Sequence, residues 1–230
     1  MFNYFDSPIF VLGLPRSGTS LIAGSLNTCG AWVGSTFPGD ENNPEGFFEH
    51  KIIRENVTKN ILKQLLGCDP LGVRKLPPIK YEVRDSNLKN IIWKILKDDG
   101  YEDNKSWLYK CPKLSLTWQF FLDAFPNAKW VIVTRDHKSI IDSILRTNFM
   151  NQHSTDYVFW ENFINQYNIR INALKNSTTN YKEIISSHIV EKNYISFIDI
   201  VNWLGLTFKK ETIEQFVYKP YYNFKLRRTF

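Results

Sequence analysis

The chain has 230 residues, of which 43% are hydrophobic and 23% charged, proportions that are typical of a globular protein. This length supports one sizeable core, and we expect a single domain over residues 1–230. The formal net charge of +6 favours anionic partners. Three cysteines without a Cys-x-x-Cys pair and four scattered histidines argue against a disulfide framework and against a metal centre.

Two features of the sequence bear on where the protein is located. Residues 1–10 contain no basic segment followed by a long apolar stretch, so we expect no signal peptide. No run approaches the roughly 20 apolar residues that a membrane-spanning helix requires. We therefore expect a soluble, cytoplasmic protein.

The first quarter of the chain predicts one strand and two helices. Residues 8–14 form an apolar run that ends in glycine, which is typical of a buried parallel strand. A helix is expected over residues 19–29, with Gly30 placed to end it. Glycine, proline and asparagine make residues 34–44 a loop. Apolar residues at helical spacing then predict a helix over residues 49–66.

The middle of the chain predicts two further buried strands. A connector broken by prolines covers residues 76–87 and leads to a helix over residues 88–96. A short strand at residues 107–109 precedes a helix over residues 114–125. The sequence WVIVT at residues 130–134 is the clearest strand of the chain.

The last third continues the alternation of strands and helices. Helices are expected over residues 136–146 and 156–174, with a polar stretch at 147–156 as a mobile lid between them. An apolar segment at residues 189–197 suggests a fourth strand, followed by a helical turn at residues 198–204. This alternation predicts an α/β fold in which a parallel β-sheet carries helices on both faces.

The sequence GLPRSGTS, residues 13–20, lies between the first strand and the first helix. Gly13 and Gly18 have the spacing of the phosphate-binding loop Gly-x-x-x-x-Gly-Lys-Ser/Thr, but Thr19 occupies the lysine position. Arg16 supplies a positive charge inside the loop instead. The backbone N–H groups of such a loop and of the following helix bind oxyanions. The missing lysine argues against kinase chemistry and leaves phosphate binding open.

A second cationic position follows the predicted strand at residues 130–134. Arg135 comes directly after that strand, and Ser143 follows eight residues later in the next predicted helix. Ligands of parallel sheets bind at the carboxyl ends of the strands. An ATPase places a metal-binding aspartate at this point, whereas this chain places an arginine there. We therefore expect a nucleotide held by cations at two places, without magnesium.

The two motifs GLPRSGTS and TRDHKSIIDS resemble the bacterial-type sulfotransferase family, which has a P-loop-like fold and uses 3′-phosphoadenosine 5′-phosphosulfate. The resemblance implies that Arg135 and Ser143 bind the 3′-phosphate of this donor, and that 3′-phosphoadenosine 5′-phosphate (PAP) is the product. It also implies contacts with the 5′-phosphosulfate from the loop residues Pro15, Arg16, Ser17, Gly18, Thr19 and Ser20.

Three other segments resemble parts of bacterial members of the family: NPEGFFE at 43–49, KCPKLSLT at 110–117 and FIDIVNWLGL at 197–206. Cys111 replaces an aspartate in the second segment, and Phe197 replaces a tyrosine in the third. Arg227 and Arg228 stand near the place where the family has basic nucleotide contacts, although a basic tail is also commonly solvated.

The reaction implied by this resemblance is the metal-independent, in-line transfer of a sulfuryl group to a hydroxyl or amine. The acceptor is a small molecule or a glycan. Arg16 and Lys110 are the candidates to stabilise charge on the leaving phosphate oxygen. Glu49 is the first candidate for the general base, followed by Glu45 and then His50. Both glutamates would also suit the first turn of the following helix.

Two alternative functions stay open. One is a P-loop nucleotide kinase or phosphotransferase, which requires the loop lysine and an aspartate that binds Mg²⁺. The other is a non-catalytic nucleotide-binding protein, whose activity Glu49→Gln and Lys110→Ala would not affect. No recognition-helix or RNA-binding motif accompanies the basic charge, so we expect no nucleic-acid partner.

Overall fold

The structure, a computed structural model, describes residues 3–41 and 43–218. Four strands form one parallel sheet in the order β2-β1-β3-β4. In this register Val11 pairs with Lys110 on one side and with Val131 on the other. The strands are β1 (Ile9–Gly13), β2 (Leu108–Lys110), β3 (Lys129–Thr134) and β4 (Tyr181–Ile185).

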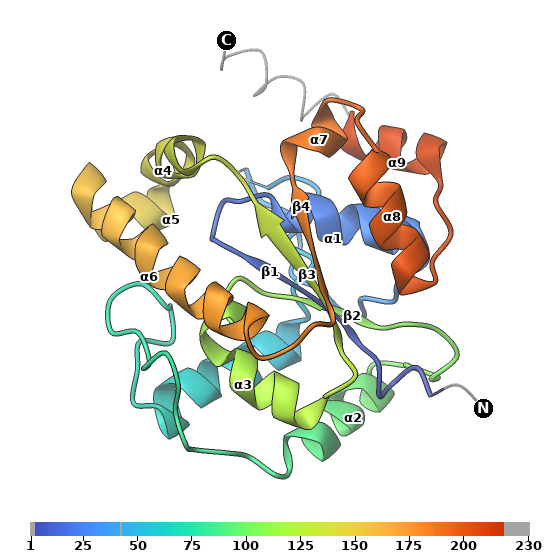
Figure 1. The fold of residues 1–230 in the computed structure, drawn as a ribbon, viewed down its shortest axis with the longest axis horizontal. Coiled ribbons are helices and arrows are strands. Elements are labelled where there is room, and N and C mark those ends of the chain that lie inside the picture. Colours follow the sequence, from blue (N-terminus) through green and yellow to red (C-terminus); the bar gives the residue numbers. More distant parts are fainter. Residues whose placement is uncertain (1–2, 42, 219–230) are drawn as a thin grey trace.

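Helices cover both faces of this sheet, as the alternation of elements predicted (Figure 1). Successive strand residues point to opposite faces, so Phe10 and Ile132 pack against α2 (Leu88–Asp98), α3 (Leu114–Ala124) and the end of α6 (Tyr157–Lys175). Val11 and Val131 pack on the other face. The helices there are α1 (Thr19–Thr28), α8 (Ile195–Leu204) and α9 (Lys210–Val217).

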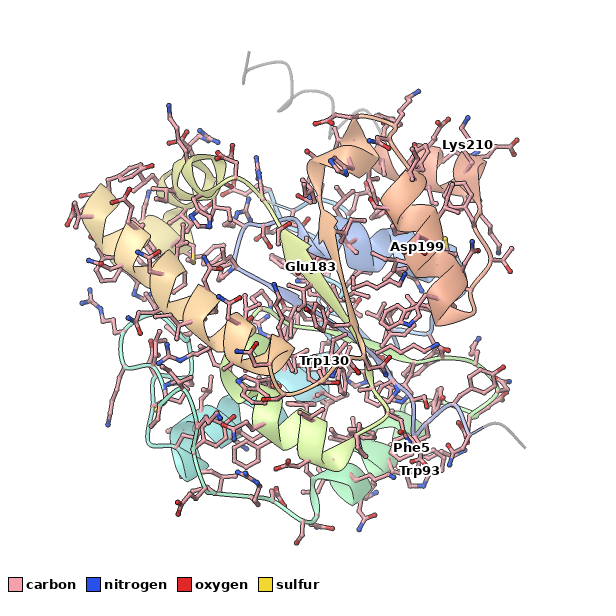
Figure 2. The ribbon with its side chains drawn as sticks, viewed as in Figure 1. Phe5, Trp93, Trp130, Glu183, Asp199 and Lys210 are labelled. Atoms are coloured by element: carbon pink, nitrogen blue, oxygen red, sulfur yellow. The ribbon has the colours of Figure 1, made fainter. Side chains whose placement is uncertain are left out.

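Aromatic side chains fill the centre of the first face. The Trp130 side chain is fully buried in the middle of the sheet, and its ring lies 4.8 Å from that of Phe10, centroid to centroid. At the edge of this core, Phe5 and Trp93 lie together with ring centroids 4.6 Å apart (Figure 2). Each such pair contributes about 0.5–1.5 kcal/mol beyond area burial.

A third cluster lies beside α4 (His137–Leu145) and α5 (Asn148–Asn151). Ile141 of α4 and Trp160 of α6 are buried in it. The expected helices at residues 136–146 and 156–174 are confirmed, and α5 lies within the stretch expected to be a lid. Within the described part of the chain, no helix is both long and apolar enough to cross a membrane.

The helix expected over residues 49–66 begins at Lys51 and contains two π-helical stretches, η1 (Ile53–Thr58) and η2 (Ile61–Leu65). The wider π turns are frequent near functional sites. Because the helix begins only at Lys51, Glu49 and His50 lie on the segment that leads into it.

The expectation of a strand at residues 189–197 is wrong. The fourth strand is β4, and residues 189–197 belong mainly to α7 (Ser187–Val190) and to α8, which starts at Ile195. β4 lies at the end of the strand order and carries Lys182 and Glu183, so its apolar signal is weak. The apolar residues further along the chain are the buried sides of helices.

This correction changes where the segment FIDIVNWLGL lies relative to the fourth strand. Phe197 is fully buried in α8 and therefore does not follow a strand. Ser186 follows β4 directly, and its N–H donates to the carbonyl oxygen of Thr134. The sequence predicted that the fourth strand ends near Phe197, whereas β4 ends at Ile185 and Ser186 is the first residue after it.

We predict that Gly24→Ala destabilises the fold, although alanine in a helix normally stabilises by roughly 1 kcal/mol over glycine. A Cβ at Gly24 of α1 would lie 2.2 Å from the Phe216 ring of α9 and 2.8 Å from that of Phe48. This overpacking should lower the free energy of unfolding, measured by urea denaturation, by about 1–3 kcal/mol. Phe216→Leu in the same chain should recover part of that loss, and an additive double variant would contradict the packing argument.

Candidate functional site

The strand order creates a switch point between β1 and β3. From β1 the chain proceeds first to β2 on one side and later to β3 on the other. Open α/β sheets bind ligands in the crevice at such a point, outside the carboxyl ends of the two strands, here those of β1 and β3. The 13–20 loop follows β1, and Arg135 follows β3. The fold thus brings together the two motifs that the sequence singled out.

The 13–20 loop has a conformation that needs its glycines. A Cβ at Gly13 would lie 2.4 Å from the carbonyl oxygen of Val133, and one at Gly18 would lie 2.6 Å from the Cβ of Ser186. Gly18 (φ 93°) and Arg16 (φ 70°) are both left-handed.

Ser17 offers a hydroxyl for a ligand in this loop. Its side chain is fully buried, and its Oγ has no hydrogen-bond partner among the residues that the structure describes. Buried polar groups normally have one. The hydroxyl lies in the loop just before the N-terminus of α1, where backbone N–H groups and the helix dipole favour an anion. The donor set of the loop therefore fits a phosphate or a phosphosulfate.

Hydrogen bonds join the loop to the second cationic motif. Arg16 Nε donates to Ser143 Oγ at 3.1 Å, and Arg135 Nη1 donates to the carbonyl oxygen of Arg16 at 3.3 Å. Burial and the nearby charge of Arg146 lower the pKa of Arg135, yet an arginine remains charged at neutral pH. The sequence analysis did not identify Arg146, which is the C-cap residue of α4, three residues after Ser143.

Lys110 and Glu49 form a buried ion pair at the end of β2. Lys110 Nζ lies 2.8 Å from Glu49 Oε1, and Arg54 Nε lies 3.1 Å from Glu49 Oε2. Burial alone would raise the pKa of Glu49, but the charges of Lys110, Lys113 and Arg54 outweigh it and keep that pKa low. Glu49 is therefore a carboxylate at neutral pH. Arg54 gave no signal in the sequence because its spacing from Glu49 follows no motif.

The segment that carries Glu49 is attached to the 13–20 loop. Ser20 Oγ donates to the carbonyl oxygen of Phe47 at 3.3 Å. Glu45 is half-buried on the same segment. Beside Glu49, burial raises the pKa of the Cys111 thiol, which lies 4.0 Å from Glu49 Oε2.

Each ring nitrogen of His50 has a polar neighbour, although among the described residues only Nδ1 meets the geometry of a hydrogen bond. Its Nε2 lies 3.2 Å from Asp99 Oδ2, and its Nδ1 accepts a hydrogen bond from the N–H of Ile53 at 3.4 Å. Burial lowers the pKa of His50, and the neighbouring Asp99 offsets this only in part. These contacts describe a neutral ring with its proton on Nε2, held in one orientation. Arg227 and Arg228 lie outside the described residues.

Carboxylates at the end of β3 are engaged in local structure. Asp136 caps α4, because its Oδ2 accepts from the N–H of Ser139 at 2.8 Å.

Thr19, at the position of the P-loop lysine, is buried. Among residues 3–41 and 43–218, no three His, Cys, Asp or Glu side chains are grouped so as to hold a metal ion.

We predict that Lys110→Ala lowers the free energy of unfolding at pH 7 by on the order of 3 kcal/mol, because it leaves Glu49 buried with weaker compensation. Urea denaturation of this variant and of Glu49→Gln/Lys110→Ala measures the effect, and the double variant should lose less than the sum of the single losses. The folded-state pKa of Glu49 is lowered, so the pair stabilises above the ordinary glutamate pKa of about 4.3. The difference between Lys110→Ala and wild type should shrink as the pH falls below that value. A pH-independent difference would contradict this account.

Comparisons with known proteins agree with the fold described above. The family model described as "Sulfotransferase family" matches residues 8–207. Comparison with curated protein sequences gives no significant match. Among solved structures, the sulfotransferase domain of the Synechococcus PCC 7002 olefin synthase is similar with a TM-score of 0.57 and 18% identity, over 94% of this chain and 80% of that one.

Two other sulfotransferase structures show the same fold. STF1 from Mycobacterium tuberculosis H37Rv has a TM-score of 0.58 and 16% identity, over 92% of this chain and 71% of that one. The sulfotransferase domain of the curacin biosynthetic pathway has a TM-score of 0.59 and 15% identity, over 94% and 79%. With the family model covering most of its length, the chain belongs to the sulfotransferase family.

Proposed function

We propose that this chain, as one domain over residues 1–230, moves a sulfuryl group from 3′-phosphoadenosine 5′-phosphosulfate to a hydroxyl or amine, without a metal. The acceptor is a small molecule or a glycan. The observation that carries the proposal is the hydrogen-bonded link from Arg135 through Arg16 to Ser143. It joins two cationic anion-binding motifs at one switch point, with no lysine in the loop.

The donor, when bound, supplies an activated sulfuryl group between its 5′-phosphate and the acceptor. Residues 15–20 would hold the 5′-phosphosulfate through the backbone N–H groups of residues 16–20 and the side-chain hydroxyls, with Ser17 Oγ as a ready donor. Arg135 and Ser143 would hold the 3′-phosphate, since they lie at the end of β3 and on α4, across the crevice. A planar guanidinium suits such an oxyanion.

Arg16 and Lys110 act on the leaving group in this proposal. A bond forms between the acceptor oxygen or nitrogen and sulfur, while the bond between sulfur and the 5′-phosphate oxygen breaks. Negative charge develops on that phosphate oxygen, and a fixed cation beside it contributes roughly 10²–10³-fold in rate. Lys110 stands at the carboxyl end of β2, beside β1 and its loop.

Glu49 takes the proton of the acceptor. In its contact with Lys110 the carboxylate is too stabilised to be an effective base. When Lys110 turns toward the leaving phosphate oxygen, Glu49 loses its nearest cation and its pKa rises toward the operating range. Glu45 is the second candidate. His50 is the third, because each of its ring nitrogens already has a polar neighbour.

We predict that PAP binds wild-type protein without metal and that Arg135→Ala weakens this binding by about 10- to 100-fold. A charge-assisted hydrogen bond is worth about 1.5–3 kcal/mol, and about 1.4 kcal/mol corresponds to tenfold in Kd. Isothermal titration calorimetry with PAP, and with ATP plus Mg²⁺, measures both affinities.

Lys138→Ala is the matched control for this titration, because Lys138 is an exposed cation on α4 three residues from Arg135. It should change the affinity for PAP by less than threefold, on the order expected for a screened surface charge. A preference for ATP with Mg²⁺ would instead support a nucleotide phosphotransferase. Equal losses of PAP affinity in Arg135→Ala and Lys138→Ala would mean that PAP is attracted only by the overall positive charge of this surface and not by a specific contact with Arg135.

We predict that Glu49→Gln lowers the rate of sulfuryl transfer by roughly 10²–10⁴-fold while PAP affinity stays within a factor of about two. The assay follows release of PAP from the donor in the presence of a panel of hydroxyl and amine acceptors. Glu45→Gln is the control on the same segment and should affect the rate much less. A larger loss in Glu45→Gln would transfer the role of base to Glu45, and no transfer by wild type with intact PAP binding would indicate a non-catalytic binder.

A further inference from the structure

Asp99 occupies a position that a carboxylate does not favour. It is the C-cap of α2, and the C-terminal end of a helix dipole repels negative charge. Two hydrogen bonds from Ser35 and a close contact with His50 offset this. Asp99 Oδ2 accepts from the N–H of Ser35 at 2.6 Å and faces His50 Nε2 at 3.2 Å, while its Oδ1 accepts from the Ser35 hydroxyl. These contacts lower the pKa of Asp99 against the effect of burial.

The partners of Asp99 belong to two segments that pair with each other. The N–H of Phe37 donates to the carbonyl oxygen of Glu49 at 3.1 Å, and the N–H of Lys51 donates to that of Ser35 at 2.9 Å. This short antiparallel pairing joins residues 35–37 to residues 49–51, with Thr36 opposite His50. Asp99 therefore holds one segment through Ser35 and the other through His50, the neighbour of Glu49.

The packing around Asp99 leaves little freedom for movement. A Cβ at Gly34 would lie 2.4 Å from Asp99 Oδ2 and 2.9 Å from His50 Cδ2. The His50 ring is held from its other side by the N–H of Ile53, at the start of the following helix. A shift of Asp99 would therefore be transmitted to the backbone on both sides of Glu49.

We propose that Asp99 is a positioning residue for the sulfuryl transfer proposed above, on which this inference rests. Through Ser35 and His50 it holds the backbone at Glu49 in place, so that the Glu49 carboxylate lies in contact with Lys110 in the free protein and keeps its position when that lysine turns toward the donor. The other groups that face this carboxylate are Arg54, Lys113 and Cys111. Neither Asp99 nor Ser35 contacts the predicted donor-binding residues in any of these bonds.

The direction in which the pKa of Glu49 shifts distinguishes a displaced Glu49 carboxylate from the direct electrostatic effect of removing the Asp99 charge. Removing a nearby carboxylate reduces like-charge repulsion, which on its own lowers the pKa of Glu49. Loosening the contact between Glu49 and Lys110 raises it. An upward shift after loss of Asp99 therefore reports a displaced Glu49 and not a missing charge.

The experiment is a titration of the Glu49 carboxyl carbon by NMR in protein labelled with ¹³C-glutamate, for wild type, Asp99→Ala and Asp99→Asn. In Asp99→Ala we expect the pKa of Glu49 to rise by about 1, within the effect of one close opposite charge. Asp99→Asn should stay near wild type, because its amide oxygen still accepts from Ser35 and His50 and its amide donates to the Ser35 hydroxyl.

Asp103→Ala is the matched control, since Asp103 accepts from the N–H of Phe5 and the Tyr101 hydroxyl in the same connector but has no bond to residues 35–37 or 49–51. It should leave the pKa of Glu49 unchanged. Should Asp99→Ala fail to fold, Ser35→Ala removes the hydroxyl bond to Asp99 Oδ1 and His50→Phe removes the ring nitrogen that faces Oδ2, and each should give a smaller rise. An unchanged or lower pKa of Glu49 in folded Asp99→Ala, or in both of these replacement variants if Asp99→Ala does not fold, would overturn the proposal.

This titration needs neither donor nor acceptor, so it is independent of the proposed function. PAP titrated into the same variants should bind as it does to wild type. A wild type that does not bind PAP would contradict the proposed function and leave the positioning result as measured. Bound PAP with an unmoved Glu49 would contradict only the role of Asp99.

Discussion

The parallel pairing of β1 with β3 is the constraint on which the rest of the site depends. It runs in register from Ile9 opposite Lys129 to Gly13 opposite Val133. It leaves no room for a side chain at Gly13, whose Cβ would meet the Val133 carbonyl oxygen. Because both strands end at the same edge, the loop after β1 meets Arg135 after β3. Without that register, neither anion-binding motif would have a partner.

The charged side chains of the site form two separate groups. Arg135 and Arg16 contact the loop and α4, where an anionic donor would lie, whereas Glu49 and Lys110 meet at the end of β2. A buried ion pair of this kind is not a strong source of stability, because desolvation offsets most of the Coulomb attraction. In the proposed reaction, this contact would hold one base for the acceptor proton beside one cation for the charge on the leaving group.

Two residues of the site have left-handed backbone. Within the described part of the chain, four non-glycine residues have positive φ: Arg16 in the loop, Phe48 beside Glu49, and Asp103 and Lys192 elsewhere. Left-handed backbone at such residues costs of order 1–3 kcal/mol and persists where the surroundings enforce it. At Arg16 the enforcing contacts are those with Ser143 and Arg135, and beside Phe48 they are the pairing of residues 35–37 with 49–51 and the Asp99 hydrogen bonds.

The sequence by itself determined the strands at residues 8–14 and 130–134, the helices beside them and the glycine-containing loop at residues 13–20 between a strand and a helix. Apolar runs and glycine spacing are local signals, so these elements can be predicted without knowing which segments pack against them. The sequence did not predict β4, because an edge strand that contains Lys182 and Glu183 shows little apolar pattern. Only the tertiary structure decided which charges meet. Arg16 and Ser143 are 127 residues apart in sequence, and Glu49 and Lys110 are 61 apart, distances over which no local propensity acts.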